Sequence, residues 1–567
     1  MGDQNTTSNI NFHLTSITFN DGTKLDLHPN DIVVIVGPNN SGKSVSLREI
    51  LNSIEYSDGR LPKNIVLEIE SARSGSPDDV IAWLESHNKK EIHNSAVEYV
   101  GLDARVNEAF VEYAWLRQSD LESLTRFFCN FISTEERLQA TKPVKNIDIS
   151  RDSRNKPIQL LLDDINFEKN LSKKTQEAFD IPFFLNRWQG NMLSLLVGNP
   201  PAGEPWTREY SNKLSQIPEI SEQGDGIRSF IGCVLELSIP RYFITMIDEP
   251  EAFLHPSSAR ILGRILAKDK RDNKQLFIAT HSVDLLRGLL DAGTGNLRII
   301  RITRDDDKNP IRELNPDDIE LLWSDSLLRS SNILDGLFHE KVVVCESDSD
   351  SRFYSALSDS ILDLSPGKYR PDVMFVSVGG KHRIHVVIKA LMALGVDVRV
   401  IADFDILKEK NDIKHLVEAF GGNWNDFNSD WTKVSTSLNL ISPPLNVNQT
   451  KQEIDKILES QKNPYLDEDS LTKIKDKLKM VSPWAYVKQS GKTAISSGDA
   501  TGNYIDLEQK LRALGLFIVE VGELERFVPL VGGHGPAWVN KVLEKDLATD
   551  PELEIAREFI KKVLDLE

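Results

Sequence analysis

Hydrophobic residues occur in two patterns that alternate along the chain. Short apolar runs end abruptly at polar residues, as in "DIVVIVG", "RYFITMIDE", "KVVVCES" and "VDVRVIADFD". Runs of this length are typical of strands buried on both faces of a sheet. Elsewhere apolar residues are spaced three and four apart, as at Leu47, Ile50, Leu51 and Ile54, which is the pattern of one helix face. The alternation predicts an α/β fold.

Length, charge and cysteine content narrow the class of protein. A chain of 567 residues exceeds the size of one hydrophobic core, so two to four domains are expected. No apolar run approaches the ~18 residues of a membrane span, and "MGDQNTTSNINFHL" does not read as a signal peptide. Cys129, Cys233 and Cys345 lie far apart, which favours reduced thiols and a cytoplasmic location. With a net charge of −19, any nucleic-acid contact requires a local basic groove or a bridging metal.

A phosphate-binding loop follows the first buried run. The segment "GPNNSGKS" has the complete spacing of such a loop, with a strand before it and an amphipathic helix after it. Its glycines let backbone N–H groups surround the phosphates of ATP, and the helix N-terminus adds its positive end. Lys43 is expected to reach the β- and γ-phosphates, and Ser44 to ligate Mg²⁺. The residues predicted to bind the nucleotide are Gly37, Asn40, Ser41, Gly42, Lys43 and Ser44.

Two further strands supply the polar residues that hydrolysis requires. Asp248 and Glu249 follow an apolar run, which predicts that Asp248 holds Mg²⁺ and that Glu249 polarises the attacking water. A surface pair of acids is the alternative. Another strand ends in "ATHS", and His281 is predicted to sense the γ-phosphate, although a structural histidine is the other interpretation.

These motifs resemble the ATP-binding-cassette class of ATPases, in the branch shared with chromosome-maintenance proteins. That class covers the ATP of a second subunit with a serine- and glycine-rich signature. Ser221, Gly224 and Gly226, in "ISEQGDGIRSF", are the candidates here, and a glycine-rich helix cap is the alternative. The resemblance implies a homodimer or higher homo-oligomer formed through the ATPase heads.

Acidic residues are concentrated at the ends of strands in the second half of the chain. Glu346 follows "KVVVC", and Asp350 lies four residues later, on the same face if a helix begins there. Asp403 and Asp405 lie at the end of "VRVIADFD", where residues two apart in an extended chain point the same way. Converging carboxylates repel one another unless a cation neutralises them, and oxygen ligands suit Mg²⁺ or Mn²⁺. Solvated strand ends are the alternative.

The order strand–Glu, then strand–Asp-x-Asp, resembles the Toprim fold of topoisomerases, primases and nucleases. A Toprim domain behind an ATP-binding-cassette head is the arrangement of the OLD (overcoming lysogenization defect) family of nucleases, and the resemblance covers nearly the whole chain. It implies metal binding by Glu346, Asp350, Asp403 and Asp405. It also implies a lysine and acids near the C-terminal end: Lys492, with Lys488 as second choice, and Glu523 and Glu525. The family's glycine after the first glutamate is replaced here by Ser347.

The predicted domains follow from these motifs. Residues 1–90 and 217–335 form the ATPase domain, interrupted by a mostly helical insertion at 91–216 that is a candidate dimerisation region. Residues 336–567 form the Toprim domain, with a helical insertion at 410–480.

The resulting functional hypothesis is an ATP-hydrolysing, metal-dependent DNA endonuclease. The resemblance further implies a role in antiphage defence and an operon partner, either the reverse transcriptase and msDNA of a retron or a helicase as in Gabija. An ATP-dependent DNA-binding or sensor protein with a non-cleaving Toprim domain is the alternative. The absence of a tyrosine from the Toprim motifs disfavours a topoisomerase.

Overall fold

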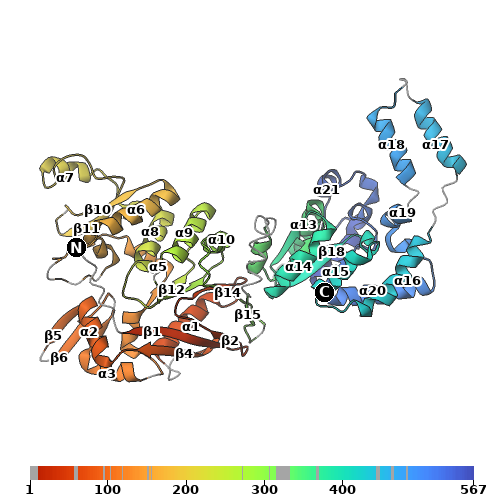
Figure 1. Ribbon diagram of the computed structural model, residues 1–567. Helices are drawn as coiled ribbons and strands as arrows, with labels where there is room; N and C mark the ends of the chain where they lie inside the picture. Colours follow the sequence, from red (N-terminus) through yellow and green to blue (C-terminus); the bar gives the residue numbers. More distant parts are fainter. Residues whose placement is uncertain are drawn as a thin grey trace. The chain divides into compact units, whose positions relative to one another are not determined.

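The structure is a computed structural model in which the chain forms two compact units, residues 1–319 and 320–567 (Figure 1). It describes residues 10–566 except 57–61, 94–95, 103, 118, 150–151, 153, 155, 189, 271, 306, 315–331, 365–368, 442–446, 461–464 and 480–482. The division falls ahead of the boundary predicted at residue 336, and residues 315–331 lie outside the described residues. No helix among the described residues is both long and apolar enough to cross a membrane.

A six-stranded sheet forms the centre of the first unit. Its neighbouring strands are parallel except for the antiparallel pair at the β15 edge. In spatial order the strands are β15 (Ile311–Glu313), β14 (Leu297–Ile302), β3 (Ile32–Val36), β13 (Gln275–Ala279), β12 (Ile244–Asp248) and β8 (Cys129–Ile132). Every residue of β3, β12 and β13 is buried, as expected for strands covered on both faces.

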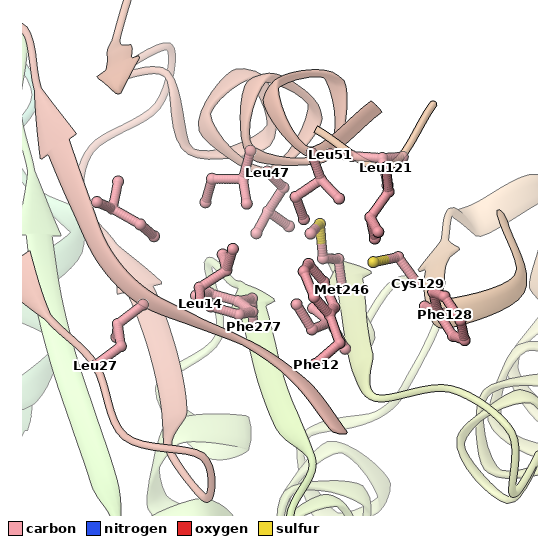
Figure 2. Packing of buried hydrophobic residues seen from close by; sticks show 14 of the residues in the cluster. Phe12, Leu14, Leu27, Leu47, Leu51, Leu121, Phe128, Cys129, Met246 and Phe277 are labelled. Atoms are coloured by element: carbon pink, nitrogen blue, oxygen red, sulfur yellow. The ribbon is translucent and has the colours of Figure 1, made fainter. Parts of the chain in front are cut away.

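The main core lies between this sheet, helix α1 (Lys43–Glu55) and an antiparallel sheet made of β2 (Lys24–Asp26), β1 (Asn11–Phe19) and β4 (Val66–Ser74). Figure 2 shows Phe12 and Leu14 from β1 meeting Met246 and Phe277, with Leu47 among the α1 residues above them. Burying side chains of this size stabilises the fold by about 1.5–3 kcal/mol each.

Three-stranded sheets and helices complete the first unit. One small sheet contains β5 (Lys89–His93), β6 (Ala96–Val100) and β7 (Arg105–Asn107), and another contains β10 (Phe183–Asn186), β11 (Met192–Val197) and β9 (Val144–Lys145). The remaining helices are α2 (Pro77–His87), α3 (Glu108–Leu116), α4 (Thr125–Phe128), α5 (Thr134–Ala140), α6 (Ile165–Phe179), α7 (Arg208–Leu214), α8 (Asp225–Leu237), α9 (Pro256–Lys268) and α10 (Val283–Asp291).

Segment 91–216 is therefore not mostly helical. It contains strands as well as helices, and its strand β8 belongs to the central sheet, where Ile132 is paired with Ile247 of β12. The stretch "TRFFCNFIS" is a short apolar run, which periodicity alone cannot assign to helix or strand. Pairing with β12 shows that this run is a strand. An insertion that begins at residue 91 and ends at 216 would therefore include part of the ATPase core.

The second unit is built on a four-stranded parallel sheet in the order β17 (Val373–Ser377), β16 (Lys341–Cys345), β18 (Asp397–Ala402) and β19 (Leu516–Ile518). Because all four strands are parallel, their carboxyl ends lie at one edge, where open α/β sheets bind ligands. The helices are α13 (Asp348–Asp363), α14 (Ile384–Ala393), α15 (Lys410–Ala419), α16 (Asn425–Asn439), α17 (Val447–Glu459), α18 (Glu468–Lys479), α19 (Pro483–Ser490), α20 (Asp499–Leu514), α21 (Pro536–Val542) and α22 (Glu554–Leu564).

Candidate functional site

The phosphate loop lies between β3 and α1, and its conformation depends on glycine. Gly37 and Gly42 have φ of 148° and 101°, values that favour glycine. A Cβ on Gly37 would lie 2.0 Å from the carbonyl oxygen of Ile302, so this position also requires glycine for space. The Ser41 side chain is 2% exposed, and its hydroxyl has no hydrogen-bond partner within the described part of the chain. A buried unpaired donor in this loop fits an anionic ligand.

Lys43 and Ser44 extend from the start of α1 toward the loop and the end of β12. Lys43 Nζ donates to the carbonyl oxygens of Gly37 at 2.8 Å and Pro38 at 2.7 Å. Burial lowers the pKa of Lys43 to about 8, although the nearby acids partly offset this effect. Ser44 Oγ donates to Asp248 Oδ1 at 2.7 Å, which brings together the two side chains predicted to share Mg²⁺.

Glu249 and His281 also meet, at the ends of neighbouring strands. His281 Nε2 lies 3.3 Å from Glu249 Oε1, and burial followed by the charge of Lys43 lowers the pKa of His281. Glu249 has φ of 47°, which is strained for a residue with a side chain. Glu251, which the sequence did not single out, accepts from Thr280 Oγ1 and from the His281 N–H, both at 2.7 Å. The histidine loop is thus fixed by a carboxylate two residues beyond Glu249.

Arg137 on α5 is a second residue that the sequence did not reveal. Its side chain is fully buried and donates to the carbonyl oxygens of Asp248 and Glu249, both at 2.8 Å. It also donates to Ser229 Oγ on α8 and to Thr134 Oγ1, both at 3.0 Å. An arginine inside "STEERLQA" carries no local signal, because Ser229, Asp248 and Glu249 are about a hundred positions away in the chain.

The three signature candidates gather at the beginning of α8. Ser221 lies in a short 3₁₀ helix (Ile220–Glu222), Gly224 caps α8, and Gly226 is in its first turn. A Cβ on Gly224 would meet nothing within 4 Å, so this helix N-terminus faces open space. At Gly226 a Cβ would lie 2.7 Å from the carbonyl oxygen of Phe253, so close packing explains why this residue is a glycine.

In the second unit the predicted acids lie together at the carboxyl edge of the sheet. Glu346 follows β16, and Asp403 and Asp405 follow β18 directly, with Asp405 inside a short 3₁₀ helix (Phe404–Leu407). Glu346 Oε1 accepts from the Asp403 N–H at 3.3 Å. Adjacent parallel strands thus bring residues 57 positions apart into contact.

Burial, and then mutual repulsion, raises the pKa values of these acids. Burial, followed by the charge of Asp405, raises the pKa of Glu346 to about 7. Burial, followed by the charges of Glu346 and Asp350, raises the pKa of Asp403 well above its usual value. The pKa of Asp350 is raised too, chiefly by burial. Carboxylates that resist ionisation when crowded are the donor set that a divalent cation stabilises.

Asp350 has a local structural role as well. Ser347 caps α13, with its N–H donating to Asp350 Oδ2 at 2.9 Å while its hydroxyl accepts from the Asp350 N–H at 3.3 Å. Ser347 has φ of −130°, an extended conformation open to any residue. Serine therefore adopts this conformation without strain at the position where the resembling family has glycine.

The lysine predicted first is not the one that joins the cluster. Lys492 Nζ pairs with Glu520 at 3.1 Å, whereas Lys488 Nζ lies 3.8 Å from Asp403, 3.9 Å from Asp405 and 3.7 Å from Glu523. Burial would lower the pKa of Lys488, but these carboxylates raise it.

A close backbone contact sets the position of Lys488. Helix α19 ends at Ser490, and Gly491 follows with φ of 54°. A Cβ on Gly522 would lie 2.1 Å from the carbonyl oxygen of Lys488, so only glycine allows this approach. The helix end is therefore held against the loop that carries Glu523.

Glu523 and Glu525 form a second acidic group with His534. Ligand atoms of the three residues lie within 4.8 Å of one another, and they are the only such triad in the parts of the chain described. Glu525 Oε1 accepts from the Gly535 N–H at 2.7 Å and lies 3.1 Å from His534 Nδ1. The charge of Glu525 also raises the pKa of Asp350, which links this group to the first one.

Comparisons with known proteins agree with this arrangement. A family model described as "AAA domain, putative AbiEii toxin, Type IV TA system" matches residues 32–287. The model "Overcoming lysogenization defect protein-like, TOPRIM domain" matches residues 337–405.

Two curated proteins match shorter stretches. The chain is 28% identical over 174 residues to the Old nuclease of Escherichia phage P2, covering 29% of this chain and 28% of that protein. It is 41% identical over 69 residues to uncharacterized protein MJECL11 of Methanocaldococcus jannaschii, covering 12% of this chain and 60% of that protein. Each match spans less than two thirds of the relative's own length.

Solved structures of SMC heads are also similar. The SMC head bound to the C-winged helix domain of ScpA matches with a TM-score of 0.33 and 13% identity, covering 55% of this chain and 99% of that chain. The SMC head domain from Thermotoga maritima matches with a TM-score of 0.28 and 11% identity, covering 54% and 99%. The two family matches give this chain an AAA-type ATPase domain followed by an OLD-like TOPRIM domain, and part of the chain is similar to the Old nuclease of phage P2.

Proposed function

We propose that this protein is an ATP-hydrolysing, divalent-metal-dependent DNA endonuclease. The observation that supports this most directly is the convergence of Glu346, Asp403, Asp405 and Lys488 at one edge of the TOPRIM sheet. The match to the Old nuclease of phage P2 supports the same activity, over a part of each chain.

The carboxylates divide into two groups that would each hold Mg²⁺ or Mn²⁺. Glu346, Asp403 and Asp405 form the first, and Glu523 and Glu525 form the second, with His534 beside it. Asp350 interacts with Glu346 and with Glu525, so it would serve either group. When bound, the two ions would activate a water molecule and stabilise the leaving oxygen of a phosphodiester. Lys488 Nζ, within 4 Å of acids from both groups, would offset the negative charge that develops on the phosphate.

In the first unit the residues support ATP binding and hydrolysis. Lys43 would bind the β- and γ-phosphates, and Ser44 and Asp248 would hold Mg²⁺. Glu249 would orient the attacking water, and His281, 3.3 Å away, would contact the γ-phosphate.

The open N-terminus of α8 supports dimerisation of the ATPase heads. Ser221 and Gly224 would cover ATP bound to a second copy of the chain, so hydrolysis would require a homodimer. Glu249→Gln should then accumulate as an ATP-bound dimer, which sedimentation velocity measures. A variant that stays monomeric at saturating ATP would contradict this part of the proposal.

The three cysteines are free and buried, which fits a cytoplasmic protein. An antiphage role, with a retron reverse transcriptase or a helicase as operon partner, completes the proposal. Its test is protection of cells from phage infection by the wild type and loss of protection in Asp403→Ala.

The nuclease activity is tested with purified full-length protein, supercoiled plasmid and Mg²⁺ or Mn²⁺. Asp403→Ala should abolish nicking and cutting while leaving ATP hydrolysis unchanged, because Asp403 lies in the other unit. Asp397→Ala is the matched control, since Asp397 begins the same strand and pairs with Lys341 and Arg399. Cleavage that persists in Asp403→Ala would overturn the assignment, and a wild type that binds DNA without cutting it would instead indicate a sensor.

A further inference from the structure

The loop that follows β17 brings a further lysine to the acid cluster. Lys381 Nζ lies 3.6 Å from Asp405 Oδ1, and Lys488 Nζ lies 3.9 Å from Asp405 Oδ2. One carboxylate is therefore bracketed by two lysines from separate elements. Lys381 belongs to a short 3₁₀ helix (Lys381–Arg383), and neither family resemblance nor the nuclease proposal gives it a role.

Two glycines give this loop its path. Gly379 and Gly380 have φ of 69° and 131°, which side-chain-bearing residues rarely adopt. A Cβ on either glycine would meet nothing within 4 Å, so the space above the loop is open. The Gly380 N–H donates to the carbonyl oxygen of Glu346 at 3.0 Å, which ties the loop to the first acid of the cluster.

The contact between Lys381 and Asp405 is too long to be a hydrogen bond. At 3.6 Å it is a loose ion pair, and such a partly exposed pair contributes about 0–1 kcal/mol to stability. The contribution of this ion pair to the stability of the fold therefore does not explain why residue 381 is a lysine. A cation bound by Asp405 would remove the attraction that holds Lys381, leaving a mobile ammonium group beside the cluster.

A DNA strand needs local positive charge to approach this edge. The chain has a net charge of −19, and the cluster itself is anionic. Lys488 lies near acids of both groups, whereas Lys381 lies near Asp405 Oδ1 on an open loop, followed by exposed His382 and Arg383. His382 is paired with Asp412 at 2.9 Å, and among residues 381–383 the structure shows an ion pair with the acid cluster for Lys381.

We propose that Lys381 is a substrate-binding residue that contacts a backbone phosphate of DNA next to the one being cleaved. The glycine pair lets the DNA backbone approach the loop, and the ammonium group replaces its contact with Asp405 by one with the phosphate. This inference rests on the proposed nuclease function and adds to it the residue that positions the strand.

The test measures DNA binding and cleavage by the full-length protein. Binding of a fluorescent duplex is followed by anisotropy with Ca²⁺ across a series of NaCl concentrations. Each lost phosphate contact reduces the slope of log K against log[salt] by ~0.9, so Lys381→Ala should show that reduction. Its KM for DNA should rise about tenfold with kcat within about threefold, because a positioning contact made before and during the reaction is lost. Lys381→Arg should retain the wild-type slope.

Lys389→Ala is the matched control, because Lys389 is exposed on α14, directly after the loop. An unchanged salt slope and KM in Lys381→Ala, with an active wild type, would overturn this inference alone. A wild type that does not cleave DNA would instead overturn the nuclease proposal, so the two failures are distinguishable.

Discussion

Replacing Arg137 by lysine tests how the hydrolytic turn after β12 is held in place. Arginine presents a planar fork of donors, whereas lysine presents one compact ammonium group. In the structure the guanidinium group of Arg137 donates to the carbonyl oxygens of Asp248 and Glu249 at once, and it also donates to Ser229 on α8. Lysine keeps the positive charge and removes this geometry.

The magnitude follows from the contacts that lysine cannot make. Of four hydrogen bonds, we expect lysine to leave about two buried acceptors without a donor, at about 1–3 kcal/mol each, so the free energy of unfolding should fall by about 2–6 kcal/mol. Glu249 has φ of 47°, and a strained backbone of this kind costs about 1–3 kcal/mol to maintain. If the turn relaxes by that amount, kcat for ATP hydrolysis should fall about 5- to 150-fold.

The assay separates positioning from folding. ATP hydrolysis gives kcat and KM, a fluorescent nucleotide gives the Kd, and urea denaturation gives the free energy of unfolding. Because Lys43 and the loop backbone are untouched, the nucleotide Kd should change by less than about threefold. Arg187→Lys is the matched control, since Arg187 also donates to a backbone carbonyl, that of Leu161 at 2.8 Å, but directly after β10 and away from the hydrolytic turn.

A wild-type kcat in folded Arg137→Lys would refute the reasoning, because it would show that the turn keeps its shape without the fork. An equal loss of kcat in Arg187→Lys would also refute it, since general loosening of the unit would then explain both results.

Three other perturbations test the two sites. Lys43→Ala should raise the nucleotide Kd at least tenfold by removing the ammonium group next to the phosphates, while metal binding by the TOPRIM acids, measured by calorimetry, stays unchanged. Without metal, stability should fall as pH rises from about 4.5 to 7, because the pKa of folded Glu346 is raised to about 7 and the folded state holds the proton more tightly. Mg²⁺ or Mn²⁺ should reverse that loss, and a melting temperature that follows the same pH curve with and without metal would argue against a cation site. Gly522→Ala should destabilise the second unit by about 1–3 kcal/mol and reduce DNA cleavage, because its Cβ would lie 2.1 Å from the carbonyl oxygen of Lys488. Nuclease activity equal to wild type would show that the position of Lys488 does not matter for cleavage.

Local pattern was sufficient for the buried strands that carry the predicted acids, although not for β8. Four of the predicted site residues, Asp248, Glu249, Glu346 and Asp403, end a strand or directly follow one, so a short apolar run marks each one. Local pattern did not identify which lysine lies beside the acid cluster. Lys488 and Lys492 are four residues apart and would share one face of a continuous helix, but α19 ends at Ser490 and Gly491 turns the chain. The helix end is fixed by contacts with residues 520–522, which the local sequence does not contain.

By itself the sequence determined the α/β class, the phosphate loop and which acids terminate strands, because each depends on neighbours within about ten residues. Only the tertiary structure assigned β8 to the central sheet, placed Arg137 on the carbonyl oxygens of the hydrolytic turn, and selected Lys488 and Lys381 as the cations beside the acids. These features depend on the order of the strands and on close backbone contacts between segments that are far apart in the chain. The free energy that favours them is gained only when those segments pack together.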